Sequence, residues 1–179
     1  MQLLDDKRLV DERQIDFMIL EELACSPPFA RWFLGQTGHT GAGTLELLRL
    51  LHGSAVLLVV HAIATGSRAL FIETKAGAAF TRSQPERHRI RGQAGVVAGC
   101  WQEFATVLAA PQHYLTDVAQ GVFNHKIPFE TIGQAIEAHG DPARIACKLK
   151  LLDCAIAKVH HERPKKTPRS YWRGADISR

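Results

Sequence analysis

Glu73 and Lys75 are the residues whose types and spacing point most directly to chemistry. They follow four apolar positions in "ALFIETKAG", residues 69–77, at the end of what the pattern predicts to be a buried strand. Side chains two residues apart on a strand leave the same face, so both would share one site while Thr74 leaves the other face. There a carboxylate can hold Mg²⁺, and an ammonium can orient or deprotonate water and neutralise phosphate charge. A bare acid-x-lysine pair is also common as a surface ion pair at a strand end.

The composition fits one basic domain. The chain has 179 residues, 46% hydrophobic and 22% charged, which suffices for a single core. Its net charge of +4 and pI of about 9.0 suit an anionic partner such as nucleic acid but do not decide the function. There is no apolar run of about 18 residues, and the N-terminus is too polar for a secretory signal. We therefore expect a cytoplasmic protein with no membrane partner.

The cysteines do not form a metal or disulfide motif. They are scattered along the chain without a CxxC pair, so neither a zinc knuckle nor a disulfide framework is indicated. We expect reduced thiols, most of them buried, at Cys25, Cys100, Cys147 and Cys154.

The first half of the chain predicts a helix followed by a hairpin. An amphipathic pattern from residue 12 should stop near Ser26, where two prolines follow, and a short helical turn then ends at Gly35. Residues 44–53 are ambiguous between helix and strand. The β-branched run 54–64, the turn "TGSR" and the strand 69–75 form an antiparallel hairpin that brings the outer strand ends to one edge.

The second half alternates helices and strands. Ser83 is a predicted N-cap with Pro85 early in the helix that follows, and "EFATVLAAP" reads as a buried strand ending at Pro111. Two further helices are predicted over residues 128–140 and 141–162, the second capped by Asp141. This alternation indicates an α/β or α+β layer.

The predicted domain ends before a basic tail. Residues 1–162 are expected to form the folded unit. Residues 163–179 are basic, broken by prolines and without apolar period, so we expect a tail that is disordered or orders on a partner.

This order of elements resembles the PD-(D/E)XK nuclease superfamily, in its small stand-alone RecB-like members, over residues 12 to about 160. The string "FIETKAGAAFTRSQPERHRIRG" looks like that family's strand, Ala-rich loop and helix opening with Gln. Gln84 with His88 is similar to the family's Q-x-x-x-Y element, with His in place of Tyr. The resemblance implies a restriction-endonuclease-like core, with a central mixed sheet of four to five strands flanked by helices.

One position departs from the family pattern. The Asp expected at the start of the preceding strand is Ala55, and no other acid lies between Glu46 and Glu73. Either the chain is a natural degenerate relative that binds without cutting, or Ala55 is an engineered replacement of an original Asp. We favour the replacement because the other site residues are intact. The chain as it stands is expected to be inactive or nearly so.

The resemblance also implies roles for individual residues. Glu73 and the residue at position 55 would hold Mg²⁺ or Mn²⁺, Lys75 would position the attacking water, and Gln84 would steady the metal shell. An outer acidic ligand is expected from the first helix, at Glu21 or Glu22. The candidate nucleic-acid contacts are Arg82, Arg87, His88 and Arg91.

Three functions follow as expectations. The first is a metal-dependent nuclease that hydrolyses phosphodiester bonds of DNA, or of RNA, in defence, restriction or repair. The second is a non-catalytic nucleic-acid-binding or assembly module on the same fold. The third is a polypeptide-interaction domain whose basic tail docks an acidic partner. A homodimer is a further expected state, because many nucleases that cut both strands are symmetric dimers.

Overall fold

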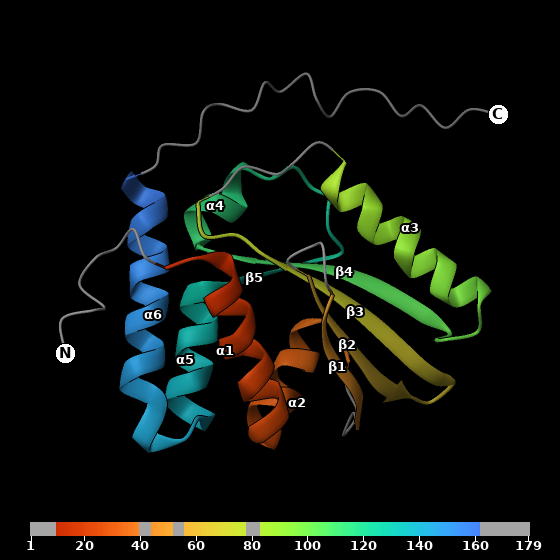
Figure 1. The fold of residues 1–179 in the computed structure, drawn as a ribbon, viewed down its shortest axis with the longest axis horizontal. Helices are drawn as coiled ribbons and strands as arrows, with labels where there is room; N and C mark the ends of the chain where they lie inside the picture. Colours follow the sequence, from red (N-terminus) through yellow and green to blue (C-terminus); the bar gives the residue numbers. More distant parts are fainter. Residues whose placement is uncertain (1–9, 40–43, 52–55, 78–82, 162–179) are drawn as a thin grey trace.

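The structure is a computed structural model that describes residues 10–39, 44–51, 56–77 and 83–161 (Figure 1). Ala55, Arg82 and the predicted tail at 163–179 lie outside the described residues. Within the described part of the chain, no helix is long and apolar enough to cross a membrane.

Six helices and five strands are described, and the chain order is as follows. It runs α1 Glu12–Cys25, α2 Pro27–Gln36, β1 Leu45–Leu51, β2 Val56–Ile63, β3 Gly66–Thr74, α3 Gln84–Val97, β4 Glu103–Ala110, α4 Gln112–Asp117, β5 His125–Pro128, α5 Phe129–His139 and α6 Pro142–His161.

A single serine separates the first two helices. Helix α1 begins at a capping box. The Gln14 N–H donates to the Asp11 carboxylate, and the Asp11 N–H donates to the side-chain oxygen of Gln14. It ends before Ser26, as predicted from the prolines. The Ser26 hydroxyl then accepts a bond from the Phe29 N–H and so caps α2. The second helix continues to Gln36, one residue beyond the expected end.

The sheet is mixed and has the order β1-β2-β3-β4-β5. Strands β1, β2 and β3 are antiparallel neighbours, whereas β4 runs parallel to both β3 and β5. The hairpin prediction is confirmed, with Val56 opposite Glu73 and Ile63 opposite Gly66. The turn is tighter than expected, since residues 66–68 already belong to β3. A five-stranded mixed sheet flanked by helices makes this an α+β fold, as predicted at that level.

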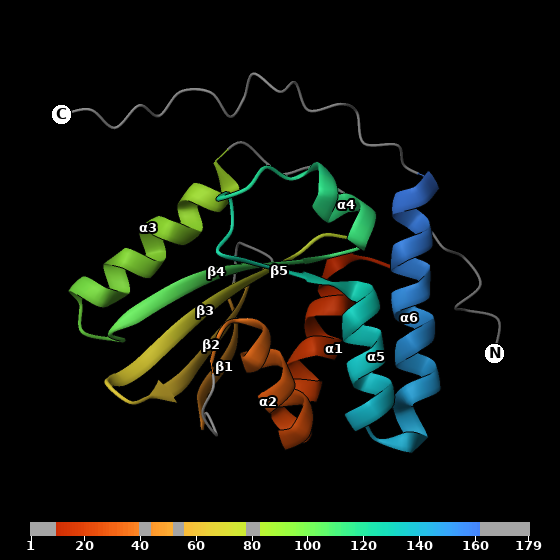
Figure 2. The same ribbon diagram turned by 180° about the vertical axis from the view of Figure 1, so that it is seen from behind.

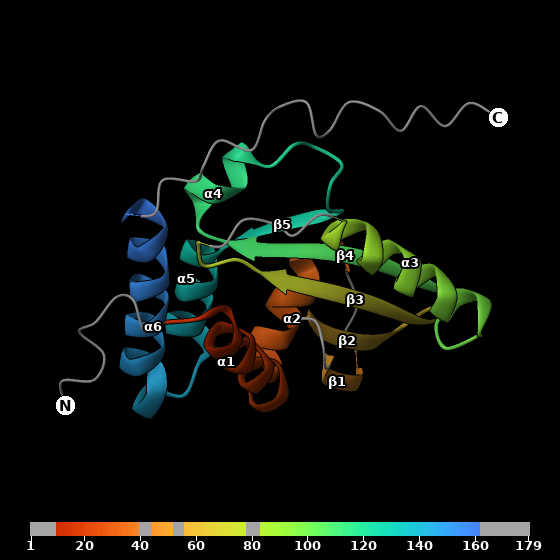
Figure 3. The same cartoon turned by 45° about the horizontal axis from the view of Figure 1, so that its top comes forward.

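Helices cover both faces of the sheet unequally (Figures 1 and 2). Helices α1, α2, α5 and α6 lie on one face and enclose the main hydrophobic cluster with the inward residues of β2 to β5. Helices α3 and α4 lie on the opposite face, where two smaller clusters form around Phe71 and around Leu108. Figure 3 shows α3 lying over the β3 and β4 side of this face.

Glycines allow α3 to pack closely on two aromatic rings. A Cβ at Gly92 would lie 2.2 Å from the Phe104 ring, and a Cβ at Gly95 would lie 1.9 Å from the Trp101 ring. The Trp101 indole N–H also donates to the Gly92 carbonyl at 2.9 Å. The spacing between α3 and the sheet therefore depends on two positions without side chains.

Several predictions need correction. Helix α3 starts where expected, but Ser83 has a left-handed backbone (φ 68°) and makes no side-chain cap, so its hydroxyl accepts instead from the Arg87 guanidinium at 3.3 Å. Residues 44–53, left ambiguous, contain strand β1. Helix α4 and strand β5 were not predicted. The expectation of mostly buried thiols is wrong, because only Cys154 is buried while the exposed ones are Cys25, Cys100 and Cys147.

The two C-terminal helices agree with prediction. Helices α5 and α6 occupy the expected ranges. The Asp141 carboxylate accepts from the Ala143 N–H at 3.0 Å, the predicted cap of α6.

Candidate active site

Glu73 is a fully buried acid inside an apolar row. The sheet register places Val56 on one side of it and Leu108 on the other, and neighbouring residues in register share a face of the sheet. The relative exposure of Glu73 is 0%. An isolated carboxylate at such a position would be costly, because burial removes the water that solvates its charge. Its partners must therefore compensate.

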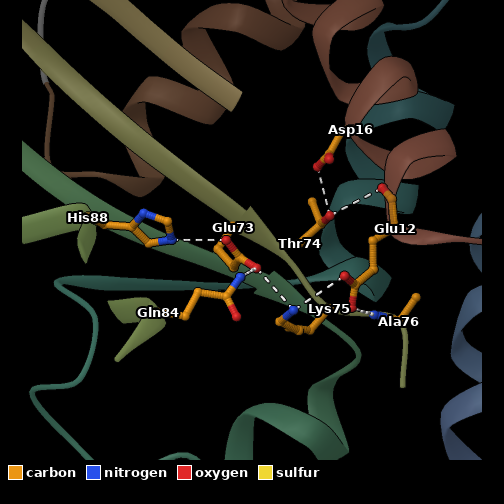
Figure 4. Close-up of polar contacts among 8 residues, drawn as sticks. All are labelled: Glu12, Asp16, Glu73, Thr74, Lys75, Ala76, Gln84 and His88. Atoms are coloured by element: carbon orange, nitrogen blue, oxygen red, sulfur yellow. Dashed lines mark hydrogen bonds and ion pairs between the residues drawn. The ribbon is translucent and has the colours of Figure 1, made fainter. Parts of the chain in front are cut away.

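Three side chains hold the Glu73 carboxylate (Figure 4). The Gln84 amide donates to Oε1, and the Lys75 ammonium lies 3.0 Å from the same oxygen. The His88 Nε2 is 2.9 Å from Oε2, and because a carboxylate only accepts, this nitrogen carries the proton. Gln84 and His88 are four residues apart on α3 and so present one helix face to the acid. Both oxygens of Glu73 are thus engaged.

Lys75 lies between two acids. Its ammonium is 3.0 Å from Glu73 and 3.3 Å from a carboxylate oxygen of Glu12 at the start of α1. The other Glu12 oxygen accepts from the Ala76 N–H at 3.4 Å. The acid and base of the sequence motif therefore do form one site, and α1 adds a second acid to it.

A further acid lies on the opposite face of β3. The Thr74 hydroxyl donates to Asp16 Oδ1 at 2.7 Å, whereas Asp16 Oδ2 has no hydrogen-bond partner in the described residues. Burial raises the pKa of Asp16 to about 7, with the charges of Glu73 and Glu12 contributing in the same direction. Burial also raises the pKa of Glu12, against the lowering effect of Lys75.

The arrangement is therefore rich in carboxyl groups. Glu12, Asp16 and Glu73 lie around the end of β3 with Lys75 among them. Because Asp16 takes up a proton near neutral pH, the group can accept or release a proton in that range. A buried cluster of this kind, with perturbed acids beside an ammonium, is typical of sites that bind charged ligands or transfer protons.

The outer acids predicted from α1 lie elsewhere. Glu21 and Glu22 stand about nine residues beyond Glu12, which is about 14 Å along a helix axis. They contact α6 instead, where Lys148 pairs with both and Arg144 pairs with Glu21. Their assignment to the Glu73 site was wrong, because the N-terminal end of α1, not its last turns, meets β3.

The predicted nucleic-acid contacts separate into different environments. His88 is fully buried and contacts Glu73, so its assignment as a nucleic-acid contact needs correction. Arg87 is exposed, and Arg91 is half-buried at the rim of a pocket described below. Arg82 and Ala55 fall outside the described residues.

The residues around Glu73 offer only part of a magnesium site. Glu73 and Glu12 offer the hard oxygen donors that Mg²⁺ prefers, but Lys75 already bridges them. The β2 residue opposite Glu73 is Val56, whose side chain has no atom that can ligate a metal. In the part of the chain that the structure describes, no group of three or more His, Cys, Asp or Glu side chains could hold a metal. The described residues do not complete a magnesium site.

Known proteins add nothing to this picture. No protein-family model, no curated protein and no solved structure matches the chain.

Two site residues were missed from the sequence, and one of them carried a signal. Asp16 lies between Ile15 and Met18 in the buried stripe of α1, and an acid inside such a stripe requires a buried partner. Glu12 gave no such signal, since it is only half-buried at the first turn of the helix.

Proposed function

We propose that this protein carries a phosphodiester-hydrolysing site of the metal-dependent PD-(D/E)XK nuclease type, silent in this chain because position 55 is alanine. DNA, or RNA, is the proposed substrate, and Mg²⁺ or Mn²⁺ the proposed cofactor of the restored site. The supporting observation is the fully buried Glu73 carboxylate with Lys75 and Gln84 on the same oxygen. The order of elements α1, β1 to β3, α3 and β4 also agrees with the resemblance in the sequence.

A surface ion pair is a poorer account of the acid-x-lysine motif. Glu73 is 0% exposed and Lys75 4%, so both charges have been removed from water. A buried pair of this kind stabilises a fold little better than apolar residues of similar volume. Retaining it, together with Gln84 and His88, is better explained by a use for the charges than by stability.

The second candidate is a nucleic-acid-binding module without catalysis on the same fold. One observation favours it for the chain as it stands: Lys75 lies between Glu73 and Glu12, where a shared cation would otherwise be expected. An ammonium in that place neutralises the acids without metal. The protein could then bind a phosphate backbone and leave it intact.

Restoring the acid at position 55 tests the nuclease proposal. We expect Ala55→Asp to bind Mg²⁺ in calorimetry and to cleave supercoiled, linear or single-stranded DNA, or RNA, about 100-fold or more faster than the parent chain. A second carboxylate contributes several kcal/mol of charge stabilisation around a metal, and each 1.4 kcal/mol is about tenfold in rate.

Two further variants make that test specific. Ala55→Asn has nearly the same side-chain shape as Ala55→Asp but no charge, and it should remain inactive. Glu73→Gln in the Ala55→Asp background should abolish the restored cleavage. Failure of Ala55→Asp to cut any of these substrates would reject the nuclease and leave the binding module.

A further inference from the structure

A pocket lies on the α3 side of the sheet, beside the Glu73 site. Its volume is about 400 Å³, within the range of roughly 300–1,000 Å³ that holds small ligands. The residues that line it come from three strands, from α3 and from the segment that follows α3. They are Arg49, Leu51, Leu58, Phe71, Arg91 and Trp101.

The pocket lies on the same face of the sheet as the Glu73 carboxylate. Phe71 precedes Glu73 by two residues on β3 and so shares its face, about 7 Å away along the strand. Leu58 lies opposite Phe71 on β2. On α3, Arg91 follows His88 by three residues, which places it on the helix face that contacts Glu73.

The lining combines an apolar floor with a cationic rim. Leu51, Leu58 and Phe71 offer only hydrocarbon surface, while the exposed Arg49 on β1 and the half-buried Arg91 on α3 add two guanidinium groups to the lining. The Trp101 ring is fixed by its hydrogen bond to Gly92. Guanidinium groups are matched to phosphate geometry, and aromatic and aliphatic surfaces accept a flat ring.

We propose that this pocket binds one unpaired base of a single nucleic-acid strand, with the adjoining phosphate held by Arg49 and Arg91. A nucleotide unites the flat apolar ring and the anionic group that the lining requires. Bases inside a duplex are paired and stacked, so a separate pocket for one base selects single-stranded or frayed ends. The choice of a nucleic-acid strand as the ligand rests on the proposed nucleic-acid function, but its binding does not require cleavage.

Binding without metal tests this inference in the full chain as it exists. The probe is fluorescein-labelled oligothymidylate, compared with the same strand annealed to its complement, in fluorescence anisotropy. We expect the single strand to bind more tightly than the duplex. Arg49→Glu should weaken single-strand binding about tenfold, because it replaces a phosphate contact with a repulsive charge.

A matched variant separates the pocket from general charge. Arg31→Glu makes the same charge change at an exposed position of α2, across the sheet, and should weaken binding much less. Thymidine monophosphate should displace the oligonucleotide, whereas inorganic phosphate at equal ionic strength should not. Arg49 is exposed, so both arginine variants should keep the unfolding midpoint of the parent chain.

Three outcomes would overturn the pocket proposal. These are equal loss of affinity in Arg49→Glu and Arg31→Glu, equal binding of duplex and single strand, and displacement by phosphate as efficient as by the nucleotide. Failure of the nuclease proposal is separate, since it requires absence of cleavage by Ala55→Asp. Pocket-dependent binding with no cleavage would support this inference and reject the enzyme.

Discussion

Helix α1 carries a pair of acids at each end, and the two pairs have different electrostatic surroundings. At its C-terminal end, Glu21 and Glu22 meet the two cations Arg144 and Lys148 of α6. At its N-terminal end, Glu12 joins the acid Glu73 around the ammonium of Lys75, and Asp16 binds Thr74 on the other face of β3.

At the C-terminal end of α1, two acids and two cations form ion pairs that connect α1 to α6. Arg144 is 54% exposed and Glu21 31%, so water and salt screen much of their attraction, while the buried Glu22 is neutralised by Lys148. At the other end Asp16 and Glu73 are fully buried, and among the described residues one carboxyl oxygen of Asp16 has no hydrogen-bond partner. Opposite charges are therefore matched where they only join helices, whereas acids outnumber cations at the end of β3, where a ligand or proton can complete them.

The largest expected effect comes from removing the shared ammonium. Lys75→Met leaves Glu73 buried without its cation and should lower the free energy of unfolding by about 3–5 kcal/mol, the usual cost of breaking a buried pair. Urea unfolding at neutral pH measures it. Lys148→Met is the comparison at the other end: it leaves Glu22, which is 2% exposed, without its cation and should also cost about 3–5 kcal/mol, because Arg144 contacts only Glu21. A loss below about 1 kcal/mol in Lys75→Met would contradict a buried Glu73 carboxylate that depends on its cation.

An intermediate effect is expected from pH. The folded-state pKa of Asp16, about 7, lies above its ordinary 3.8, so the folded protein keeps a proton that the unfolded chain releases. Stability from this group is therefore greatest below about pH 4 and falls as pH rises to about 7, by at most about 1.4 kcal/mol per pH unit.

Asp16→Asn isolates that contribution. The amide keeps an oxygen that can accept from Thr74 but does not ionise. Urea unfolding should show the variant about 2 kcal/mol more stable than the parent at pH 8 and little different at pH 4. Parallel pH profiles for parent and variant would exclude Asp16 as the titrating group.

The smallest effect should come from Arg144, the exposed cation that pairs with Glu21. Arg144→Ala should reduce the free energy of unfolding by less than about 1 kcal/mol, and high salt should diminish the loss further. Thermal unfolding at low and high ionic strength measures both. A loss as large as that of Lys75→Met would mean that the exposed Arg144–Glu21 pair contributes as much to the free energy of unfolding as the buried Lys75 pairs.

Local signals in the sequence were sufficient for most of the fold. The prolines after Ser26 and the β-branched run of β2 each determine their element with little help from distant residues. Strand β5 was missed because four residues ending in Pro128 give no period to detect. Strand β1 stayed ambiguous because "LELLRLL" lacks a clear alternation, and its pairing with β2 decides it.

The site was predictable along β3 but not across the fold. Glu73 and Lys75 share a face by strand geometry alone, and Gln84 with His88 shares one by helix geometry. Which end of α1 meets that strand is a tertiary fact. The sequence offered Glu21 and Glu22 as readily as Glu12, and only chain packing selects the first turn of the helix.

The close seating of α3 has a consequence for how the site could be lost. Gln84 and His88 reach the buried carboxylate because Phe104 and Trp101 fill the space above Gly92 and Gly95. A methyl group at either glycine would push α3 away from the sheet and lengthen the hydrogen bonds from Gln84 and His88 to Glu73. The geometry of the acid site at the end of β3 thus depends on Gly92 and Gly95, two residues without side chains that do not contact Glu73.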